Sequence, residues 1–293
     1  MLLAVWAVTL ATTIPLALLV RGAIREQLGA SVTAGRVADG ADADWISEFA
    51  NGATGLNTTF GPSVIGFAAV LDNASAFMEG VARPAAITAT AVGYLLLWTF
   101  LAGGIIDRFA RDRAIHSDGF FTACGLHFPA LIRLAVVSSL VYVVLFGQIR
   151  PWLLDDVFER LVRNVNVERT AFLIRLSMYA AFLIALATFN LLFDFAKVRL
   201  VCERRYSALG ALRAAGRFVV RRPLGAAAVY LGDVLLFALI VATYALVAPG
   251  AGPAGPSMWI GVAISQAYIA ARLWVKLVFW GSETAYFQGT DWS

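Results

Sequence analysis

Histidine, cysteine and charge are scarce in this 293-residue sequence. It has two histidines and two cysteines, and charged residues make up 14% of it. Neither histidine falls in a long apolar run, so the usual ligand of haem and of membrane copper sites is missing there. His116, Cys124 and His127, with Asp112 or Asp118, lie near one another in sequence but match no zinc-site spacing. We predict no metal and no cofactor.

Catalytic motifs are also missing. The sequence has no phosphate-binding glycine loop, no Gly-x-Ser-x-Gly elbow and no His-Glu-x-x-His. We therefore predict no catalytic residue and expect that the protein is not an enzyme. Cys124 and Cys202 are expected in loops on the cytoplasmic side, where thiols stay reduced, so no disulfide is predicted.

Hydrophobic residues, by contrast, make up 60% of the chain. They gather in runs of about twenty residues, the helix length that crosses a hydrocarbon core of roughly 30 Å. Six such runs use most of the chain, so we predict an all-α, polytopic transmembrane bundle that forms one membrane domain, residues 1–293. The first run lacks a preceding basic residue and a nearby cleavage site, so we predict a retained helix rather than a secretory signal. The predicted spans are about 2–20, 84–106, 129–147, 171–195, 224–248 and 257–280.

Basic residues next to the spans predict the orientation, because lysine and arginine collect in short cytoplasmic loops. The segment 196–223 carries eight basic residues and one acidic residue, Glu203, and is predicted to be cytoplasmic. Counting spans from it places both chain ends in the cytoplasm. The predicted exterior segments are then 21–83, 148–170 and 249–256. Arg21 and Arg25 run against this rule.

Two exterior stretches have apolar residues without being spans. The segment 152–165 has apolar and charged residues at helical spacing, which predicts an amphipathic helix in the membrane interface or capping the bundle. The run 64–71 is too short to span and is predicted to pack on the rim of the bundle or to be re-entrant. Within the second span, Gly103 and Gly104 predict a close approach of another helix.

A basic helix is predicted at about 205–222 in the cytoplasmic segment. Leu209, Leu212 and Val219 form its apolar stripe, with arginines at four-residue spacing beside them. Each basic residue near an anionic leaflet contributes about 1 kcal/mol. The alternative is that the arginines only mark topology and form a solvated face. The predicted contacts to anionic lipid are Arg205, Arg213, Arg217, Arg221 and Arg222.

Ionisable residues within the spans are the strongest signal of a site, because a charge in hydrocarbon costs several kcal/mol unless it is paired or hydrated. Asp233 and Arg272 both lie roughly 12 to 14 Å from the cytoplasmic ends of their spans, which predicts an ion pair. A second possibility joins Asp194 to Arg133 or Lys276. Such residues either fix the bundle through ion pairs, or line a cavity open to the cytoplasm that binds a head group, substrate or proton. The predicted intramembrane polar cluster is Asp194, Asp233, Arg272, Lys276, Asn190, Gln266 and Arg133.

Three short motifs flank the basic helix: Asp194-Phe195-Ala196-Lys197, Ala211-Leu212-Arg213 and Arg221-Arg222-Pro223. They resemble a pattern in an uncharacterised family of six-helix bacterial integral membrane proteins. That family is loosely similar to the membrane domain of some glycerophosphodiester phosphodiesterases. The resemblance covers roughly a quarter of the chain. It implies a bacterial inner-membrane α-bundle, but not phosphodiesterase activity, because the sequence has no counterpart of the catalytic domain.

These patterns predict a non-catalytic membrane protein that is an accessory, scaffolding or lipid-interacting subunit of a bacterial membrane assembly. Its expected partners are membrane lipids, especially anionic ones, and other membrane-protein subunits. Nucleic acid is not expected, because the basic residues behind the net charge of +4 lie beside spans. The alternative is a small transporter with a polar cavity facing the cytoplasm. A water-filled path to the polar cluster would favour transport.

Overall fold

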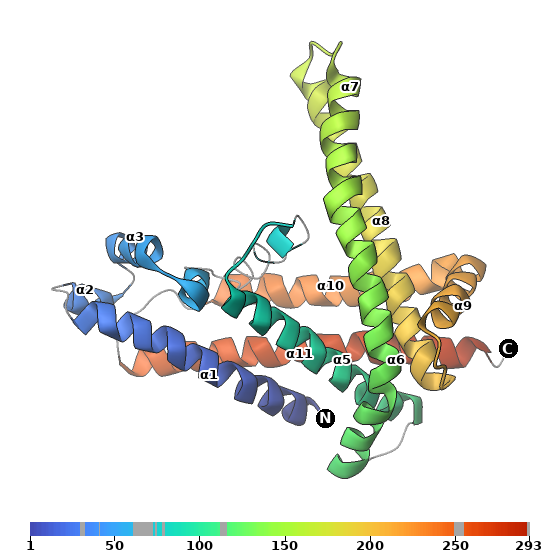
Figure 1. Cartoon of the computed structure of the whole chain (residues 1–293), viewed down its shortest axis with the longest axis horizontal. Helices are drawn as coiled ribbons and strands as arrows, with labels where there is room; N and C mark the ends of the chain where they lie inside the picture. The colour runs from blue at the N-terminus through green and yellow to red at the C-terminus, as the bar shows by residue number, and fades with distance from the viewer. Residues whose placement is uncertain are drawn as a thin grey trace. The chain divides into compact units, whose positions relative to one another are not determined.

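The structure is a computed structural model that describes residues 1–29, 33–40, 42–60, 73, 75–77, 80–111, 116–248 and 255–291. Nearly all of these residues are helical and none lies in a strand. Within these ranges, six helices are long and apolar enough to cross a membrane (Figure 1). The predicted all-α, polytopic fold is confirmed. The apolar run 64–71 lies outside the described residues.

Most of the long helices extend past the predicted spans. They are α1 (Leu2–Gly29), α5 (Ala85–Arg111), α6 (Ser117–Val144), α8 (Glu168–Cys202), α10 (Pro223–Val247) and α11 (Pro256–Asp291). Hydropathy marks only the part of a helix that lipid can cover, whereas polar turns continue the same helix beyond it. The shorter elements are α2 (Ala34–Asp39), α3 (Ala43–Gly52), η1 (Gly55–Thr59), η2 (Leu145–Ile149), η3 (Trp152–Val157), α7 (Phe158–Val162) and α9 (Ala208–Arg221).

Both cysteines lie in helices, so their predicted placement in loops was wrong. Because α6 begins at Ser117, Cys124 and His127 lie within it, and Cys202 is the last residue of α8. The first turns of α6 bury Ala123, Cys124 and His127, whereas Ser117 and Asp118 before them are exposed. A search for long apolar runs misses such a segment. Both thiols are free.

The amphipathic segment that follows the third span is not a separate interfacial helix. The elements η2, η3 and α7 continue α6 into one rod, Ser117–Val162. Pro151 lies between two wider π-helical turns. The wider turns accommodate the proline, which has no N–H to donate and whose ring would clash with the preceding turn of a regular α-helix. At 1.5 Å per residue this 46-residue rod is about 69 Å long, more than twice the thickness of a hydrocarbon core. Figure 1 shows it side by side with α8.

The chain divides into two compact units. Unit 1 comprises Met1–Asn73, Arg83–Tyr94 and Gly232–Phe279, and unit 2 comprises Ala74–Ala82, Leu95–Leu231 and Trp280–Ser293. The helices α5, α10 and α11 each contribute residues to both units.

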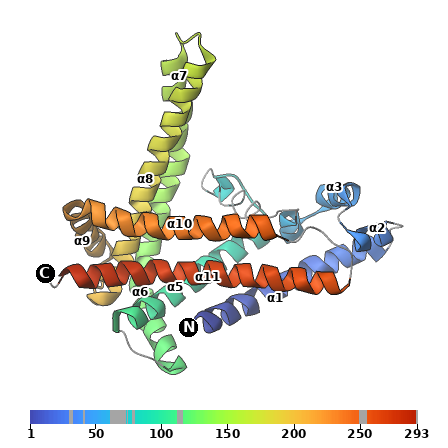
Figure 2. The ribbon, with the colours of Figure 1, turned by 180° about the vertical axis from the view of Figure 1, so that it is seen from behind.

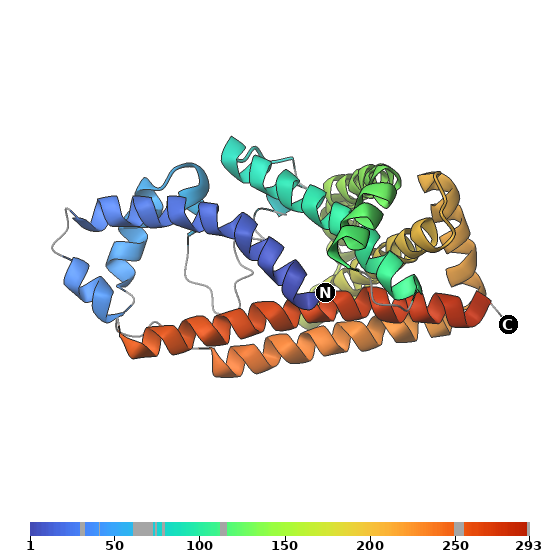
Figure 3. The same cartoon turned by 90° about the horizontal axis from the view of Figure 1, so that it is seen from below.

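In unit 1, α10 and α11 lie side by side (Figures 2 and 3). The Tyr244 ring of α10 stacks on the Tyr268 ring of α11, with centroids 3.8 Å apart. The hydroxyl oxygens of Tyr244 and Ser265 are 3.3 Å apart, within hydrogen-bond distance. Aromatic stacking and a shared hydrogen bond therefore hold the two helices together here.

The predicted exterior segment contains folded structure in unit 1. The side chain of Asp42 caps α3 by accepting a hydrogen bond from the Trp45 backbone N–H at 3.0 Å. Trp45 and Phe49 are buried, and their rings contact Phe60. This segment is thus a small aromatic-centred fold and not only a linker.

Unit 2 has a tightly packed core in which two glycines set the distance between α5 and α6. A Cβ added at Gly103 would lie 2.9 Å from the Cβ of His127. At Gly104 it would lie 2.4 Å from the Cys124 Sγ and 2.9 Å from the Phe120 carbonyl oxygen. The close helix approach predicted for these glycines is present. The fully buried side chains of unit 2 include Leu101, Ile105, Ile106, Leu134, Phe195, Val198, Leu200, Glu283 and Thr284.

Candidate functional site

The basic helix α9 packs on the rest of unit 2 through small residues. Ser207 caps its first turn by accepting a hydrogen bond from the Gly210 N–H at 3.1 Å. Figure 1 shows α9 beside α8, and the buried face of α9 consists mostly of small side chains, which allow this close approach. The buried residues of α9 are Ala208, Ala211, Ala214, Ala215 and Phe218.

The apolar stripe identified in the sequence is not the face through which this helix packs on the rest of unit 2. Leu209 is exposed, and Leu212 and Val219 are only half-buried. Large apolar residues are the default choice for a buried face in water, but helices that meet in a membrane often use small ones. The alanine face of α9 follows the membrane rule.

One large side chain, Phe218, anchors α9 to the core. Its ring lies 5.2 Å from the ring of Phe195, 6.0 Å from that of Tyr286 and 5.6 Å from that of Phe287, measured between centroids. The Arg199 guanidinium lies 5.4 Å from the Phe218 ring centroid and 4.9 Å from that of Phe287. Aromatic and cation–π contacts thus fix the rotation of α9 about its axis.

The opposite face of α9 exposes the arginines. Arg213, Arg217 and Arg221 follow at four-residue spacing and all are exposed. Leu209 and Val220, on the same side, are 66% and 79% exposed. Arginines beside exposed apolar side chains are typical of a helix that lies in a membrane interface.

Two predicted lipid contacts have a different environment. Arg205 is exposed but forms an ion pair with Glu203, which also pairs with Arg199 at 3.2 Å. Arg222 is half-buried at the end of α9. The outward basic face of α9 therefore consists of Arg213, Arg217 and Arg221.

Asn190 joins three helices of unit 2 through hydrogen bonds. Its side-chain oxygen accepts a hydrogen bond from the Tyr142 hydroxyl of α6. The Tyr230 hydroxyl of α10 also hydrogen-bonds to the Asn190 side chain. The sequence does not indicate either tyrosine, because both contacts depend on which helices are neighbours.

One turn further along α8, Asp194 pairs with Lys197, with 2.6 Å between the carboxylate oxygen and Nζ. Lys197 also interacts electrostatically with Glu283 of α11, whose side chain is fully buried. The spacing of four and three residues from Asn190 places both partners on the same face of α8. We name the resulting group the α8 polar cluster: Tyr142, Asn190, Asp194, Lys197, Tyr230 and Glu283.

We expect Asp194→Asn to lower the free energy of unfolding by about 1–3 kcal/mol, because Lys197 loses its carboxylate partner in an apolar setting. Thermal and denaturant unfolding of the purified protein in detergent measures the change. Asp156→Asn at the exposed end of the α6 rod is the matched control and should change stability by less than about 0.5 kcal/mol. Equal stability of the two variants would contradict the assigned pairing.

The rest of the predicted polar cluster is divided between the units. Arg133 lies in unit 2, exposed on α6, and donates to the Tyr206 carbonyl oxygen at 3.3 Å rather than to Asp194. The remaining members lie in unit 1: Asp233, Gln266, Arg272 and Lys276.

Within unit 1, the polar residues of α11 contact aromatic side chains. Gln266 accepts a hydrogen bond from the Trp6 indole N–H at 3.3 Å. The Arg272 guanidinium lies 5.5 Å from the Tyr268 ring centroid. Asp233 is buried, and its ion pair with Arg272 stays a prediction.

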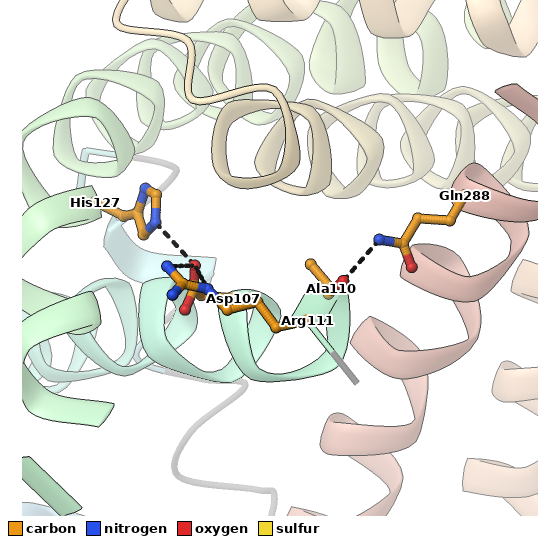
Figure 4. A network of polar contacts seen from close by, with 5 residues as sticks. All are labelled: Asp107, Ala110, Arg111, His127 and Gln288. Atoms are coloured by element: carbon orange, nitrogen blue, oxygen red, sulfur yellow. Dashed lines mark hydrogen bonds and ion pairs between the residues drawn. The ribbon is translucent and has the colours of Figure 1, made fainter. Parts of the chain in front are cut away.

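A second buried polar network, not predicted from the sequence, lies where α5 meets α6 (Figure 4). Asp107 accepts hydrogen bonds from the Arg111 guanidinium at 2.8 and 3.0 Å and lies 3.5 Å from the His127 Nε2. The Gln288 amide of α11 donates to the Ala110 carbonyl at 2.9 Å. The network ties three helix segments together. Among the described residues, no three His, Cys, Asp or Glu side chains gather as a metal site requires.

Comparison with protein families, with curated proteins and with solved structures finds no match for the chain. Two features of unit 2 bear on the function of the protein, the outward basic face of α9 and the α8 polar cluster.

Proposed function

We propose that the protein is a non-catalytic component of the bacterial inner membrane that binds anionic lipid through α9 and serves as an accessory or scaffolding subunit. The observation that carries this proposal is the fixed orientation of α9. Phe218 and the alanine face hold the helix to unit 2, so that Arg213, Arg217 and Arg221 point away from it. Three arginines at about 1 kcal/mol each contribute more than one ordinary hydrogen bond.

The position of α9 in the chain also supports this proposal. It lies in the most basic segment between two spans, which the charge rule assigns to the cytoplasm. The inner leaflet of a membrane presents anionic lipid on that side. A basic face fixed at the end of α8 then meets head groups without a large change of structure.

We expect the triple variant Arg213→Gln/Arg217→Gln/Arg221→Gln to bind phosphatidylglycerol at least about tenfold more weakly than the parent protein. The measurement is the rise in Tm of the detergent-solubilised full chain as phosphatidylglycerol is titrated, with phosphatidylcholine as the zwitterionic comparison. The phosphatidylcholine response should not change.

The matched control removes the same charge from another exposed region. Arg160, Arg163 and Arg169 lie at the exposed end of the hairpin of α6 and α8, and their replacement by glutamine should leave the phosphatidylglycerol response intact. If both triple variants lose the response equally, net charge rather than α9 is responsible and the proposal is wrong.

The α8 polar cluster favours a second candidate, a small transporter. Polar and charged side chains from four helices converge in an otherwise apolar part of unit 2, as in many substrate and proton pathways. Transport predicts that Asp194→Asn alters proton flux into reconstituted vesicles, followed with a pH-sensitive dye. Unchanged flux with lowered stability assigns the cluster a structural role.

A further inference from the structure

The turn between α8 and α9 holds an arginine where glycine is the usual residue. The Arg205 N–H donates to the Leu200 carbonyl at 3.0 Å and the Arg204 N–H to the Val201 carbonyl at 3.3 Å, the bonds of a Schellman motif. Arg204 occupies its left-handed position, with φ of 49°. A side chain at this position is strained, so the fold keeps an arginine where glycine would be more stable.

This turn lies against α6. Arg133 of α6 donates to the Tyr206 carbonyl at 3.3 Å, and Arg204 interacts electrostatically with His127. His127 and Arg133 are six residues apart, which is about 9 Å along the helix. Arg204 precedes Tyr206 by two residues, so Arg133 and Arg204 belong to the two segments that meet at this turn.

Arg133 and Arg204 differ from the neighbouring arginines in their ion pairing. Glu203 pairs with both Arg199 and Arg205. Neither Arg133 nor Arg204 forms an ion pair with a carboxylate in the part of the chain that the structure describes. Both are exposed, so two positive charges beside one turn are left for an external anion.

The surroundings of Arg133 indicate which anion fits. Leu126 and Leu140, one heptad before and after it on the same side of α6, are 57% and 63% exposed. Tyr206, whose carbonyl Arg133 contacts, is also exposed. Arginine and tyrosine beside an apolar, lipid-facing stripe are typical of the depth at which lipid phosphates lie. The exposed leucines can accept acyl chains, which a soluble phosphate does not have.

We infer that Arg133, Arg204 and the turn that carries Tyr206 form a binding site for the phosphate of one anionic lipid. We name it the headgroup site. The inference rests on the proposed function and names a specific lipid site next to the general basic face of α9. Arginine suits it because charge-assisted hydrogen bonds to phosphate oxygens are strong and directional.

The decisive variant is Arg204→Gly. Glycine suits the left-handed position, so the Tm of the lipid-free protein should stay unchanged or rise, whereas the affinity for phosphatidylglycerol should fall about tenfold. Native mass spectrometry of the full chain in detergent, with titrated phosphatidylglycerol, measures the number and affinity of bound lipids. Arg133→Gln should give the same loss of affinity. Unchanged affinity in Arg204→Gly would overturn the headgroup site.

Two controls distinguish the headgroup site from a general effect of charge and from a site for free phosphate. Arg205→Gln removes a charge from the same turn, but that charge is already paired with Glu203. The phosphatidylglycerol in the headgroup site should therefore remain bound. Inorganic phosphate at millimolar concentration should not displace the lipid, and displacement would mean a site for free phosphate instead. Equal affinity for phosphatidylcholine would also overturn the inference.

The two proposals fail in different ways. In native mass spectrometry the α9 triple variant should keep one tightly bound phosphatidylglycerol, whereas the further phosphatidylglycerol molecules, which contribute to its Tm response, should bind at least about tenfold more weakly. Arg204→Gly should lose the tight lipid and keep the weaker contacts. If the α9 variant loses the tightly bound phosphatidylglycerol and Arg204→Gly keeps it, the specific site lies on α9. That result would overturn the headgroup site alone.

Discussion

Replacing Gly104 by alanine is expected to lower the free energy of unfolding by about 3 kcal/mol. The added Cβ would lie 2.4 Å from the Cys124 Sγ and 2.9 Å from the Phe120 carbonyl oxygen. Because the second contact is with backbone, a change of side-chain rotamer cannot relieve it, and α6 has to move away from α5. Alanine favours a helix over glycine by at most about 1 kcal/mol, which does not offset this cost.

Gly93 provides the matched control for this prediction. It lies in the same helix, and a Cβ there meets no heavy atom within 4 Å. Gly93→Ala should therefore leave stability unchanged or raise it by up to about 1 kcal/mol. The measurement for both variants is unfolding of the solubilised protein by heat and by denaturant.

A double variant tests the cause of the expected loss. Gly104→Ala combined with Cys124→Ala removes the clash with sulfur but keeps the clash with the Phe120 carbonyl oxygen. In the Cys124→Ala background, Gly104→Ala should still lower the free energy of unfolding, but by less than it does in the parent protein. A double-mutant cycle measures this difference. If Gly104→Ala is as stable as Gly93→Ala, the close packing of α5 on α6 is wrong.

The membrane class of this fold follows from hydropathy alone, because a span is a local property of about twenty consecutive residues. The ends of the helices do not follow from it. Glu283 and Thr284 at the end of α11 are fully buried although they lie past the last predicted span. Their burial depends on contacts within unit 2, which come from segments distant in sequence.

The candidate site was also only partly predictable from the sequence. The spacing of Asn190, Asp194 and Lys197 on α8 is visible in the sequence, because residues three and four apart share a helix face. Tyr142 and Tyr230 are not visible, because each reaches Asn190 from another helix. For a chain in lipid, small residues rather than leucines mark the faces where helices meet, and this rule identifies the buried face of α9 correctly.

Phe218→Ala is expected to have the second large effect, a loss of about 3–5 kcal/mol. The ring contacts the rings of Phe195, Tyr286 and Phe287, and the Arg199 guanidinium lies near it. The other buried residues of α9 are alanines, so no other side chain of that helix can replace the lost contacts. Val220→Ala, two residues later at a 79% exposed position, should change stability by less than about 0.5 kcal/mol.

The same substitution separates the position of the arginines from their charge. In Phe218→Ala, Arg213 and Arg217 keep their charge, but α9 loses its anchor and becomes open to local unfolding. Trypsin should then cleave after these arginines faster than in Val220→Ala, at a temperature where the remaining chain stays folded. The rise in Tm with phosphatidylglycerol should also fall, although no basic residue has changed. If cleavage and lipid response both match those of Val220→Ala, then Phe218 does not hold α9 in place, and lipid binding through α9 does not depend on a fixed arginine face.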